Sequence, residues 1–400
     1  TNSVVGGQGG VQIEGVRRAA DQFLARVTQQ ATGASAGAAV RAETLDRAQA
    51  LFGDPTDQTS LFSALDRVFA SFAEVSLDPG STIRRASAAD NIDRFFASLN
   101  AAAQGLQVLM REVDSRVSDT AARAQGHLDT IAQLNIQIGQ ASVGGGDSSS
   151  AQNAMGLVLD DLSKIMDIRV TPGRNGGVEV RTTSGLLLVG EGASRLSHQP
   201  AAGDYASHNH VMLIDASGSS FPLDPALRTG ELKGLISARD NDLKGLAEAL
   251  GGFAAAVSEG FNIAHNANSA APAPTVMAGR QTGLLPADRL NFSGEAVIGL
   301  VDGDGQLIDR LTVDFDAGTI TRASNAATLS FTDRIGPLAG SGLIDQLNSM
   351  LAATGGGSAT FSGGVMTLNG GVHGLVVQQS ATDPSDRAGR CFTHFFGLNY

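Results

Sequence analysis

The feature that most constrains the fold of this chain is a stretch without proline between Ser81 and Ser142. Its apolar residues recur in steps of three and four, and their mean spacing of about 3.5 is the coiled-coil period. They are Leu106, Leu109, Val113, Val117, Ala121, Ala124, Leu128, Ile131, Leu134 and Ile138. A continuous helix here would be roughly 80–90 Å long at about 1.5 Å per residue. Because such a helix cannot bury its stripe alone, the spacing predicts partner helices, in a rod or in an ordinary helical bundle.

Two more helices are expected before this stretch. Residues 1–13 are glycine-rich and then extended, and apolar side chains recur on one helical face over residues 16–51. Gly33 and Gly37 weaken that pattern, and Gly53-Asp54-Pro55 ends it. A second helix is predicted at residues 60–75. Its apolar side is formed by Leu61, Leu65, Val68, Phe69 and Phe72.

The pattern changes from helix to strand at Ile168, after a flexible break at 144–150 and a helix at 151–166. Glycine-rich turns such as Ser184-Gly185 separate the first strands, as in hairpins. One long helix at about 230–267 interrupts the strands, which resume after Pro272 and Pro274 and continue to the end. The strands are expected at 168–170, 178–181, 186–189, 211–214, 296–301, 311–315 and 359–362.

These elements predict an α+β multidomain chain, with an elongated, coiled-coil-like helical rod domain followed by β-rich domains of antiparallel hairpins or sandwiches. Residues 1–167 together with about 230–268 form the expected rod. Residues 168–229 form a small β-hairpin region, and residues 269–400 form the outer β-rich domain or domains. The chain has no Trp and two Tyr, so its cores must rely on smaller apolar side chains, which suit thin layers.

The charge balance excludes several classes of partner. The net charge is −12 and no cluster of Lys or Arg occurs, so neither nucleic acid nor an anionic membrane surface is an expected partner. Cys391 is the single cysteine, which rules out a disulfide framework. No stretch is long and apolar enough for a transmembrane helix, and no classical signal peptide is visible. Since the chain lacks an initiator Met, a core fragment of a longer protein is expected.

Several motifs could carry chemistry, and each has a simpler interpretation. His208-Asn209-His210, with His198 nearby, is interpreted as solvated loop histidines and not as a metal or nuclease site. Asp302-Gly303-Asp304-Gly305 resembles the start of a calcium loop, but Val313 occupies the twelfth position, which requires a glutamate. A tight turn between strands is therefore expected.

The remaining candidates lack partners at the required spacing. Cys391 and His394 are too few for zinc, and no thiol protease signature surrounds them. Ser184-Gly185 lacks the spacing of a nucleophile elbow, and Gly6-Gly7-Gln8-Gly9-Gly10 lacks a phosphate-binding Lys-Ser/Thr. No catalytic, cofactor-binding or metal-binding residues are therefore assigned, and an enzyme is not expected.

Six blocks of sequence occur in an order that matches one known family. Four of them are I-A-x-L-N-x-x-I at 131–138, a helix-to-strand junction at 161–170, G-E-L-x-G-L…R-D at 230–240 and F-F-G-L-N at 395–399. The other two are Gly10-Val11-Gln12-Ile13 leading into Asp21-Gln22-Phe23-Leu24, which resembles the family's G-V-x-V…R…D-x-F-L, and Phe261-Asn262-Ile263-Ala264-His265, which resembles its V-N-x-x-H. Together they resemble the first flagellar hook-associated protein family, the bacterial hook–filament junction subunits. The match is weakest at 270–390, and the family's D-x-R-D reads Val158-Leu159-Asp160-Asp161 here. The family's Asn-rich N-terminal segment and C-terminal helix are absent.

This resemblance implies a structural subunit outside the cell, in the flagellum. It implies export without a cleaved signal peptide, assembly in a helical ring through the rod domain, and no cofactor. The implied partners are the hook protein, the adjacent hook-associated protein, copies of the chain itself, and an export chaperone that binds the absent C-terminal segment. In this family the absent terminal helices make the inner tube, so the fragment is expected to be monomeric. The alternatives are another axial flagellar protein, of filament or cap type, or a secreted surface adhesin; a hydrolase would need acid/base residues that are not visible.

Overall fold

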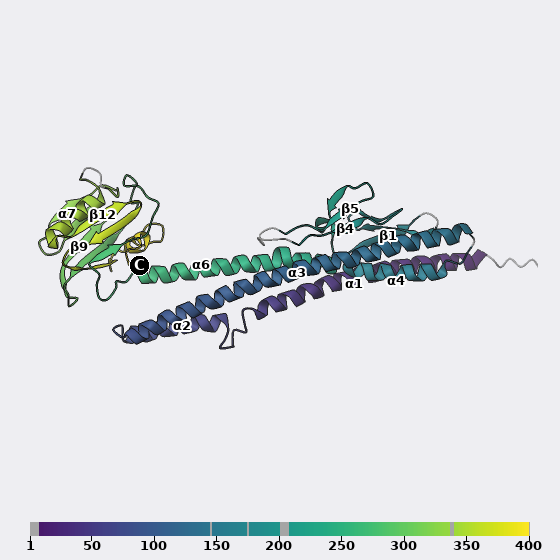
Figure 1. Cartoon of the computed structure of the whole chain (residues 1–400), viewed down its shortest axis with the longest axis horizontal. Coiled ribbons are helices and arrows are strands. Elements are labelled where there is room, and N and C mark those ends of the chain that lie inside the picture. Colours follow the sequence, from purple (N-terminus) through teal and green to yellow (C-terminus); the bar gives the residue numbers. More distant parts are fainter. Residues whose placement is uncertain (1–7, 145, 174–175, 201–207, 337–339, 400) are drawn as a thin grey trace, which may run out of the picture. The chain divides into compact units, whose positions relative to one another are not determined.

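The structure is a computed structural model that describes the chain except for residues 1–7, 145, 174–175, 201–207, 337–339 and 400. It divides into two compact units, Thr1–Gly252 and Phe253–Tyr400. Long helices come first and small antiparallel sheets follow, which confirms the expected fold class (Figure 1). No helix among the described residues is long and apolar enough to cross a membrane.

Four helices open the first unit: α1 (Gln8–Ala50), α2 (Leu61–Leu77), α3 (Thr82–Gly144) and α4 (Ser149–Ile165). The predicted second, third and fourth helices are confirmed to within two residues at each end. In contrast, α1 begins at Gln8, inside the segment expected to be extended. Ser60 caps α2 by accepting a hydrogen bond from the backbone N–H of Ser63 at 3.1 Å.

The ten apolar residues predicted to form the stripe of α3 are all buried. Helix α3 packs against α2 and α4, and it also contacts α5 (Glu231–Ser237). Exposed ion pairs join α3 to α1, between Arg47 and Glu112 and between Arg116 and Glu43. Within the first unit, α3 therefore buries its stripe against other helices of the same chain.

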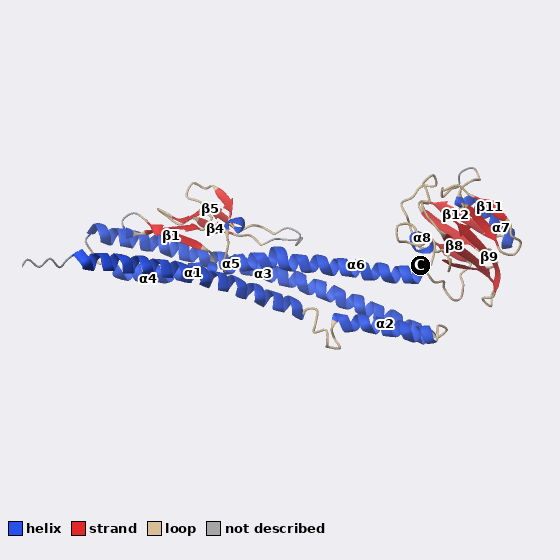
Figure 2. Ribbon diagram, turned by 180° about the vertical axis from the view of Figure 1, so that it is seen from behind, coloured by secondary structure: helices blue, strands red, loops and turns tan. Residues whose placement is uncertain are grey.

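Two three-stranded antiparallel sheets complete the first unit, and Figure 2 shows both on the same side of α3. One has the order β1-β2-β3, from β1 (Ile168–Pro172), β2 (Val178–Thr182) and β3 (Leu187–Val189), which confirms the predicted hairpins. The other has the order β4-β5-β6, from β4 (Arg195–Ser197), β5 (Met212–Ile214) and β6 (Ser220–Pro222). The sequence indicated β5 but neither of its neighbours, because three-residue strands carry too few alternating positions to be recognised.

The helix expected at 230–267 is not uniform. A short 3-10 turn (Asp224–Ala226) leads to α5, a π-helical segment (Ala238–Leu243) follows α5, and α6 (Lys244–Asn266) continues it. A π-helical turn contains an extra residue, so it changes the direction in which the following side chains point around the helix axis. The regular spacing of apolar residues over 230–267 did not predict this interruption.

The second unit contains a five-stranded sheet of order β11-β10-β9-β8-β14 and a three-stranded sheet of order β12-β13-β7. Strands β8 (Glu295–Val301) and β9 (Leu307–Asp314) form an antiparallel hairpin through Asp302–Gly305, so the predicted tight turn is confirmed. The other strands are β7 (Val276–Ala278), β10 (Thr319–Arg322), β11 (Thr328–Ser330), β12 (Ser358–Ser362), β13 (Val365–Asn369) and β14 (Gly374–Gln379).

The expectation of strands to the end of the chain was wrong in two places. Helix α7 (Leu343–Gly355) packs against β12, and Leu343, Leu347 and Leu351 on one of its faces enter the core. Gly356, in the left-handed region at φ 73°, ends this helix. The short helix α8 (Phe392–Phe396) places its phenylalanines in the same core, where Phe292 and Phe396 stack.

Candidate functional site

The three histidines singled out in the sequence lie in different environments. His198 follows β4 and its side chain is only 1% exposed, so the interpretation as a solvated loop residue was wrong for it. Its Nε2 lies 3.0 Å from a carboxylate oxygen of Asp114 on α3. His210 is 60% exposed and its Nδ1 lies 2.9 Å from Asp224. Both ring nitrogens of His208 are buried without a hydrogen-bond partner in the described part of the chain, and burial lowers the pKa of this histidine.

Asp114 and Asp224 belong to a larger group centred on Arg239, here called the Arg239 cluster: Asp114, His198, Asp224, Arg239 and Asp240. The Arg239 side chain is fully buried in the π-helical segment. Its Nη1 donates to Asp114 at 2.6 Å and its Nε donates to Asp240 at 2.6 Å, while Nη2 lies 4.0 Å from Asp224. Burial acts to lower the pKa of Arg239, but hydrogen bonds and charges from Asp240 and Asp114 outweigh it and raise that pKa. The cluster therefore joins α3, the π-helical segment and the β4–β6 sheet through paired charges.

A second site lies where α1 crosses α5, here called the glycine crossing: Gly33 and Gly37 of α1 with Gly230 and Gly234. The backbone N–H of Gly230 donates to the carbonyl of Gly33 at 3.1 Å. A Cβ added at Gly37 would lie 2.6 Å from the carbonyl oxygen of Gly230, and one at Gly234 would lie 2.3 Å from that of Gly37. Only hydrogen fits at these positions, so the two backbones are in direct contact.

Sequence reasoning missed this crossing, because it treated Gly33 and Gly37 only as a weakness of the first helix. The available signal was their spacing. Gly33 and Gly37 are four residues apart and lie on one face of α1, and Gly234 follows the N-cap of α5, Gly230, at the same spacing. Matching pairs of this kind indicate two helices that approach closely.

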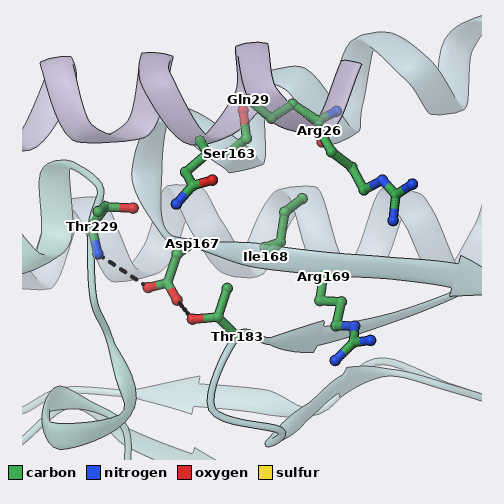
Figure 3. A pocket seen from close by; sticks show the side chains of 9 residues that line it. Arg26, Gln29, Ser163, Asp167, Ile168, Arg169, Thr183 and Thr229 are labelled. Atoms are coloured by element: carbon green, nitrogen blue, oxygen red, sulfur yellow. Dashed lines mark hydrogen bonds between the residues drawn. The ribbon is translucent and has the colours of Figure 1, made fainter. Parts of the chain in front are cut away.

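A cavity of about 330 Å³ lies beside the crossing, between α1, the end of α4 and β1 (Figure 3). On one side of it Asp167 accepts hydrogen bonds from the backbone N–H groups of Arg228, at 2.7 Å, and Thr229, at 3.3 Å; the Thr183 hydroxyl donates to its other oxygen. The lining residues are Arg26, Gln29, Gln30, Ser163, Asp167, Ile168, Arg169, Thr183 and Thr229. The carboxylate of Asp167 is thus used to hold the chain together, and the lining supplies no acid–base pair for catalysis.

In the second unit, Cys391 and His394 have structural surroundings. His394 is fully buried, with Nε2 3.1 Å from Glu259 and Nδ1 3.2 Å from Asn266, both on α6. A hydrogen bond with His394 and a further one with Arg390 lower the pKa of Glu259. Cys391 is buried, with its Sγ 3.2 Å from the Thr393 hydroxyl. The segment 391–399 therefore closes the second unit against the end of α6 and is here called the closing segment.

Metal-binding geometry is not found in the ranges that the structure describes: no group of three or more His, Cys, Asp and Glu side chains there could hold an ion. Asp302 uses one carboxylate oxygen to accept from the backbone N–H groups of Asp304, at 3.0 Å, and Gln306, at 2.8 Å, which stabilises its turn. Gly6 and Gly7 of the glycine-rich motif lie outside the described residues.

Known proteins resemble this chain over most of its length. Residues 45–271 match the family described as the flagellar hook-associated protein FlgK helical domain. Flagellar hook-associated protein 1 of Salmonella typhimurium (strain LT2) is 26% identical over 271 residues, which is 66% of this chain and 49% of that protein. The protein of the same name in Escherichia coli (strain K12) is 24% identical over 275 residues, with 66% and 50% covered. The chain thus spans about half the length of the curated relatives it matches.

A solved structure of the flagellar hook junction protein FlgK from Burkholderia pseudomallei shares the fold. It superposes with a TM-score of 0.50 at 18% identity, over 94% of this chain and 65% of that one. The family match takes in more than half of the 400 residues, from late α1 to beyond α6. It includes all five residues of the Arg239 cluster and the α5 side of the glycine crossing.

Proposed function

The chain belongs to the FlgK family of flagellar hook-associated proteins, and from that premise we propose that it is a structural subunit joining the hook to the filament of the bacterial flagellum. In this role it lies outside the cell and works by packing against other subunits, not by catalysis. Its partners are the hook protein, the adjacent hook-associated protein and copies of itself in a helical ring. It reaches that place by flagellar export, aided by an export chaperone, with no cleaved signal peptide.

The observation that carries this proposal is the family match over residues 45–271, which coincides with the packed helices and not with an isolated motif. The family is named after the flagellar hook, so the match supports a location in the flagellum for this chain. Head-to-tail contacts between identical subunits produce rings or helical assemblies, and long helices offer the extended surfaces that such contacts need.

The two sites described above suit a part that transmits force. At the glycine crossing the backbones of α1 and α5 touch, and any sliding along this contact would move Gly37 and Gly234 away from the positions that allow it. In the Arg239 cluster, sliding of α3 would separate Asp114 from Arg239 and leave charges buried without partners. Both arrangements keep the helices in register under load.

The proposal also assigns a role to each segment of the chain. Residues 1–167 with about 230–268 form the helical part that assembles with other subunits. Residues 168–229 form a small β region carried on these helices, and residues 269–400 form the outer part. This assignment is supported by the position of the family's helical-domain match and by the separate core of the second unit.

Immunogold electron microscopy of the source cells tests the function directly. Antibodies raised against this chain are expected to place gold in a band at the boundary between hook and filament. Label along the whole filament would instead identify another axial flagellar protein. Label across the cell body would favour a surface adhesin, and either result would overturn the proposal.

A further inference from the structure

The cavity beside the glycine crossing lies within the first unit and is large enough for a small molecule. Its volume of about 330 Å³ falls in the range of ligand pockets, which is about 300–1,000 Å³. Because a water molecule takes up about 30 Å³ in the liquid, this space exceeds what one or two ordered waters fill. The polar groups of its lining decide which kind of molecule it suits.

The one carboxylate of the lining is already engaged. Asp167 is 8% exposed, and its two oxygens accept from the backbone N–H groups of Arg228 and Thr229 and from the Thr183 hydroxyl. These bonds hold the start of β1 to the segment before α5. The carboxylate is thus committed to the fold, and a metal ion or an amine would find no other acidic side chain in the lining.

The remaining lining is rich in hydrogen-bond donors. Arg26, on α1, and Arg169, on β1, both line the cavity, and Figure 3 shows them on the side away from Asp167. The Arg169 guanidinium makes no hydrogen bond or ion pair with the residues that the structure describes. Within the same ranges, the Gln30 amide and the Thr229 hydroxyl also make none. Arg169 therefore brings a positive charge to the cavity without an acidic partner there.

This arrangement differs from that of other arginines in the first unit. Arg47 and Arg116, for example, each pair with a glutamate across two helices. A guanidinium group binds planar oxyanions through two parallel N–H groups, which suits phosphate and carboxylate alike. Since the chain has a net charge of −12, the molecule as a whole repels anions, and a site for one depends on local arginines.

We propose that this cavity binds a small molecule that carries a phosphate or carboxylate group. The oxyanion lies against Arg26 and Arg169, and the rest of the molecule fills the space towards Thr229. Bound there, the ligand joins α1 to β1 and stabilises the first unit. This inference goes beyond the proposed function and does not depend on it, because every residue that it uses lies inside the first unit.

Titration calorimetry of the purified chain tests the inference. The probes are inorganic phosphate and succinate, each titrated at an ionic strength held constant with sodium chloride. Binding in the millimolar range or tighter is expected for at least one probe, and the tighter one shows whether phosphate or carboxylate is preferred. Arg169→Gln is expected to weaken binding about tenfold or more, because it removes a charged hydrogen-bond donor. Absence of binding by both probes would overturn the proposal.

Arg195→Gln is the matched control. Arg195 is also exposed on a strand of the first unit, β4, and it too has no partner among the described residues. The two variants change the net charge equally, but only position 169 lines the cavity. Unchanged binding in Arg169→Gln would identify an adventitious ion only. Equal weakening in both variants would show a response to net charge, and either result would contradict the proposed site.

Thermal melting supplies a second measurement that does not depend on the heat of binding. A ligand that binds only the folded state raises the melting temperature as its concentration increases. Phosphate also stabilises proteins generally by exclusion from their surface, and that part is the same in every variant. The additional rise is expected in the original protein and in Arg195→Gln but not in Arg169→Gln. The same rise in all three would overturn the inference.

Arg169→Lys separates geometry from charge. It keeps the positive charge but replaces the planar fork of the guanidinium with a single ammonium group. Binding of the preferred probe is expected to be weaker than in the original protein and stronger than in Arg169→Gln. A lysine variant that binds no better than Arg169→Gln, although its circular dichroism and melting show that it is folded, would contradict the role given to the charge at this position.

Discussion

At the residue scale, the contact between α1 and α5 at the glycine crossing depends on the absence of side chains at Gly37 and Gly234. Gly234→Ala would place a methyl group 2.3 Å from the backbone oxygen of Gly37, which cannot move without separating α1 from α5. We expect this substitution to lower the free energy of unfolding of the first unit by about 1–3 kcal/mol, as overpacking does. Urea denaturation of both proteins measures the difference.

Gly126→Ala is the matched control for that prediction. Gly126 lies on the exposed face of α3 and a Cβ there meets nothing within 4 Å. Because alanine is the better helix former, this substitution is expected to raise stability by about 0.5–1 kcal/mol. If both substitutions had the same effect, the close approach of the backbones would not be what limits position 234.

Protonation of His208 is a second property set by a single residue. Burial lowers the pKa of His208 below its ordinary value in the folded protein. The unfolded chain therefore takes up a proton first as the pH falls below about 6.5, and folding stability is lost from there down to the folded pKa. Above pH 7 the contribution is fully present. We expect the first unit to become less stable between pH 7 and pH 5, with a slope from this group of at most about 1.4 kcal/mol per pH unit.

The variant His208→Gln is expected to remove that part of the pH dependence. Melting temperatures of the original and the variant, measured at a series of pH values, should differ by a constant amount above pH 7, and that of the original should fall relative to the variant as the pH drops towards 5. His265→Gln, at an exposed position near the end of α6, controls for the general loss of a histidine. Parallel curves for the original and His208→Gln would show that His208 is not the titrating group.

Such residue-level features were the hardest to predict from the sequence. Asp114 and Arg239 are 125 residues apart, and nothing in either local pattern marks them as partners. An aspartate on α3 and an arginine after α5 both read as ordinary solvated charges, since charged residues are almost never fully buried without a pair. The pairing exists only once α3 and the π-helical segment are packed together.

At the scale of elements, the Arg239 cluster joins three parts of the first unit. Asp114→Ala would leave Arg239 buried with less compensating charge, and the expected cost is about 3–5 kcal/mol, as for other broken buried pairs. Arg41→Ala provides the matched control, because Arg41 pairs with Asp242 of the same π-helical segment at 2.5 Å while 51% exposed. Loss of that pair should cost no more than about 1 kcal/mol. Chemical denaturation compares the two variants, and equal costs would contradict a buried role for Asp114.

Elements that repeat their pattern many times were predicted well, and short ones were not. The stripe of α3 offers ten apolar positions, and all ten are buried. The hairpins β1–β2 and β2–β3 were indicated by the glycine-rich segments between them. Helix α7 was missed although Leu343, Leu347 and Met350 have helical spacing, because strand-like segments on both sides dominated the interpretation. Three-residue strands such as β6 and β7 are defined by the neighbours with which they pair, so no local signal specifies them.

At the scale of the whole molecule, the two units have separate cores. Leu128, on α3, is fully buried in the first unit, and Leu347, on α7, is fully buried in the second. Calorimetry is expected to resolve two unfolding transitions. Leu128→Ala should lower one of them and Leu347→Ala the other, each by about 2–5 kcal/mol of unfolding free energy. A single transition that moves with both substitutions would mean that the units unfold as one.

The closing segment of the second unit contains the single sulfur nucleophile of the chain. Cys391 is 8% exposed and lies next to α8, whose phenylalanines belong to the core. A thiol reagent can reach it only when this segment opens, because reaction requires an accessible thiolate. The rate of alkylation therefore records how often the second unit opens under native conditions, without any engineered label. Alkylation of Cys391 thus reports on local opening of the second unit in the isolated protein.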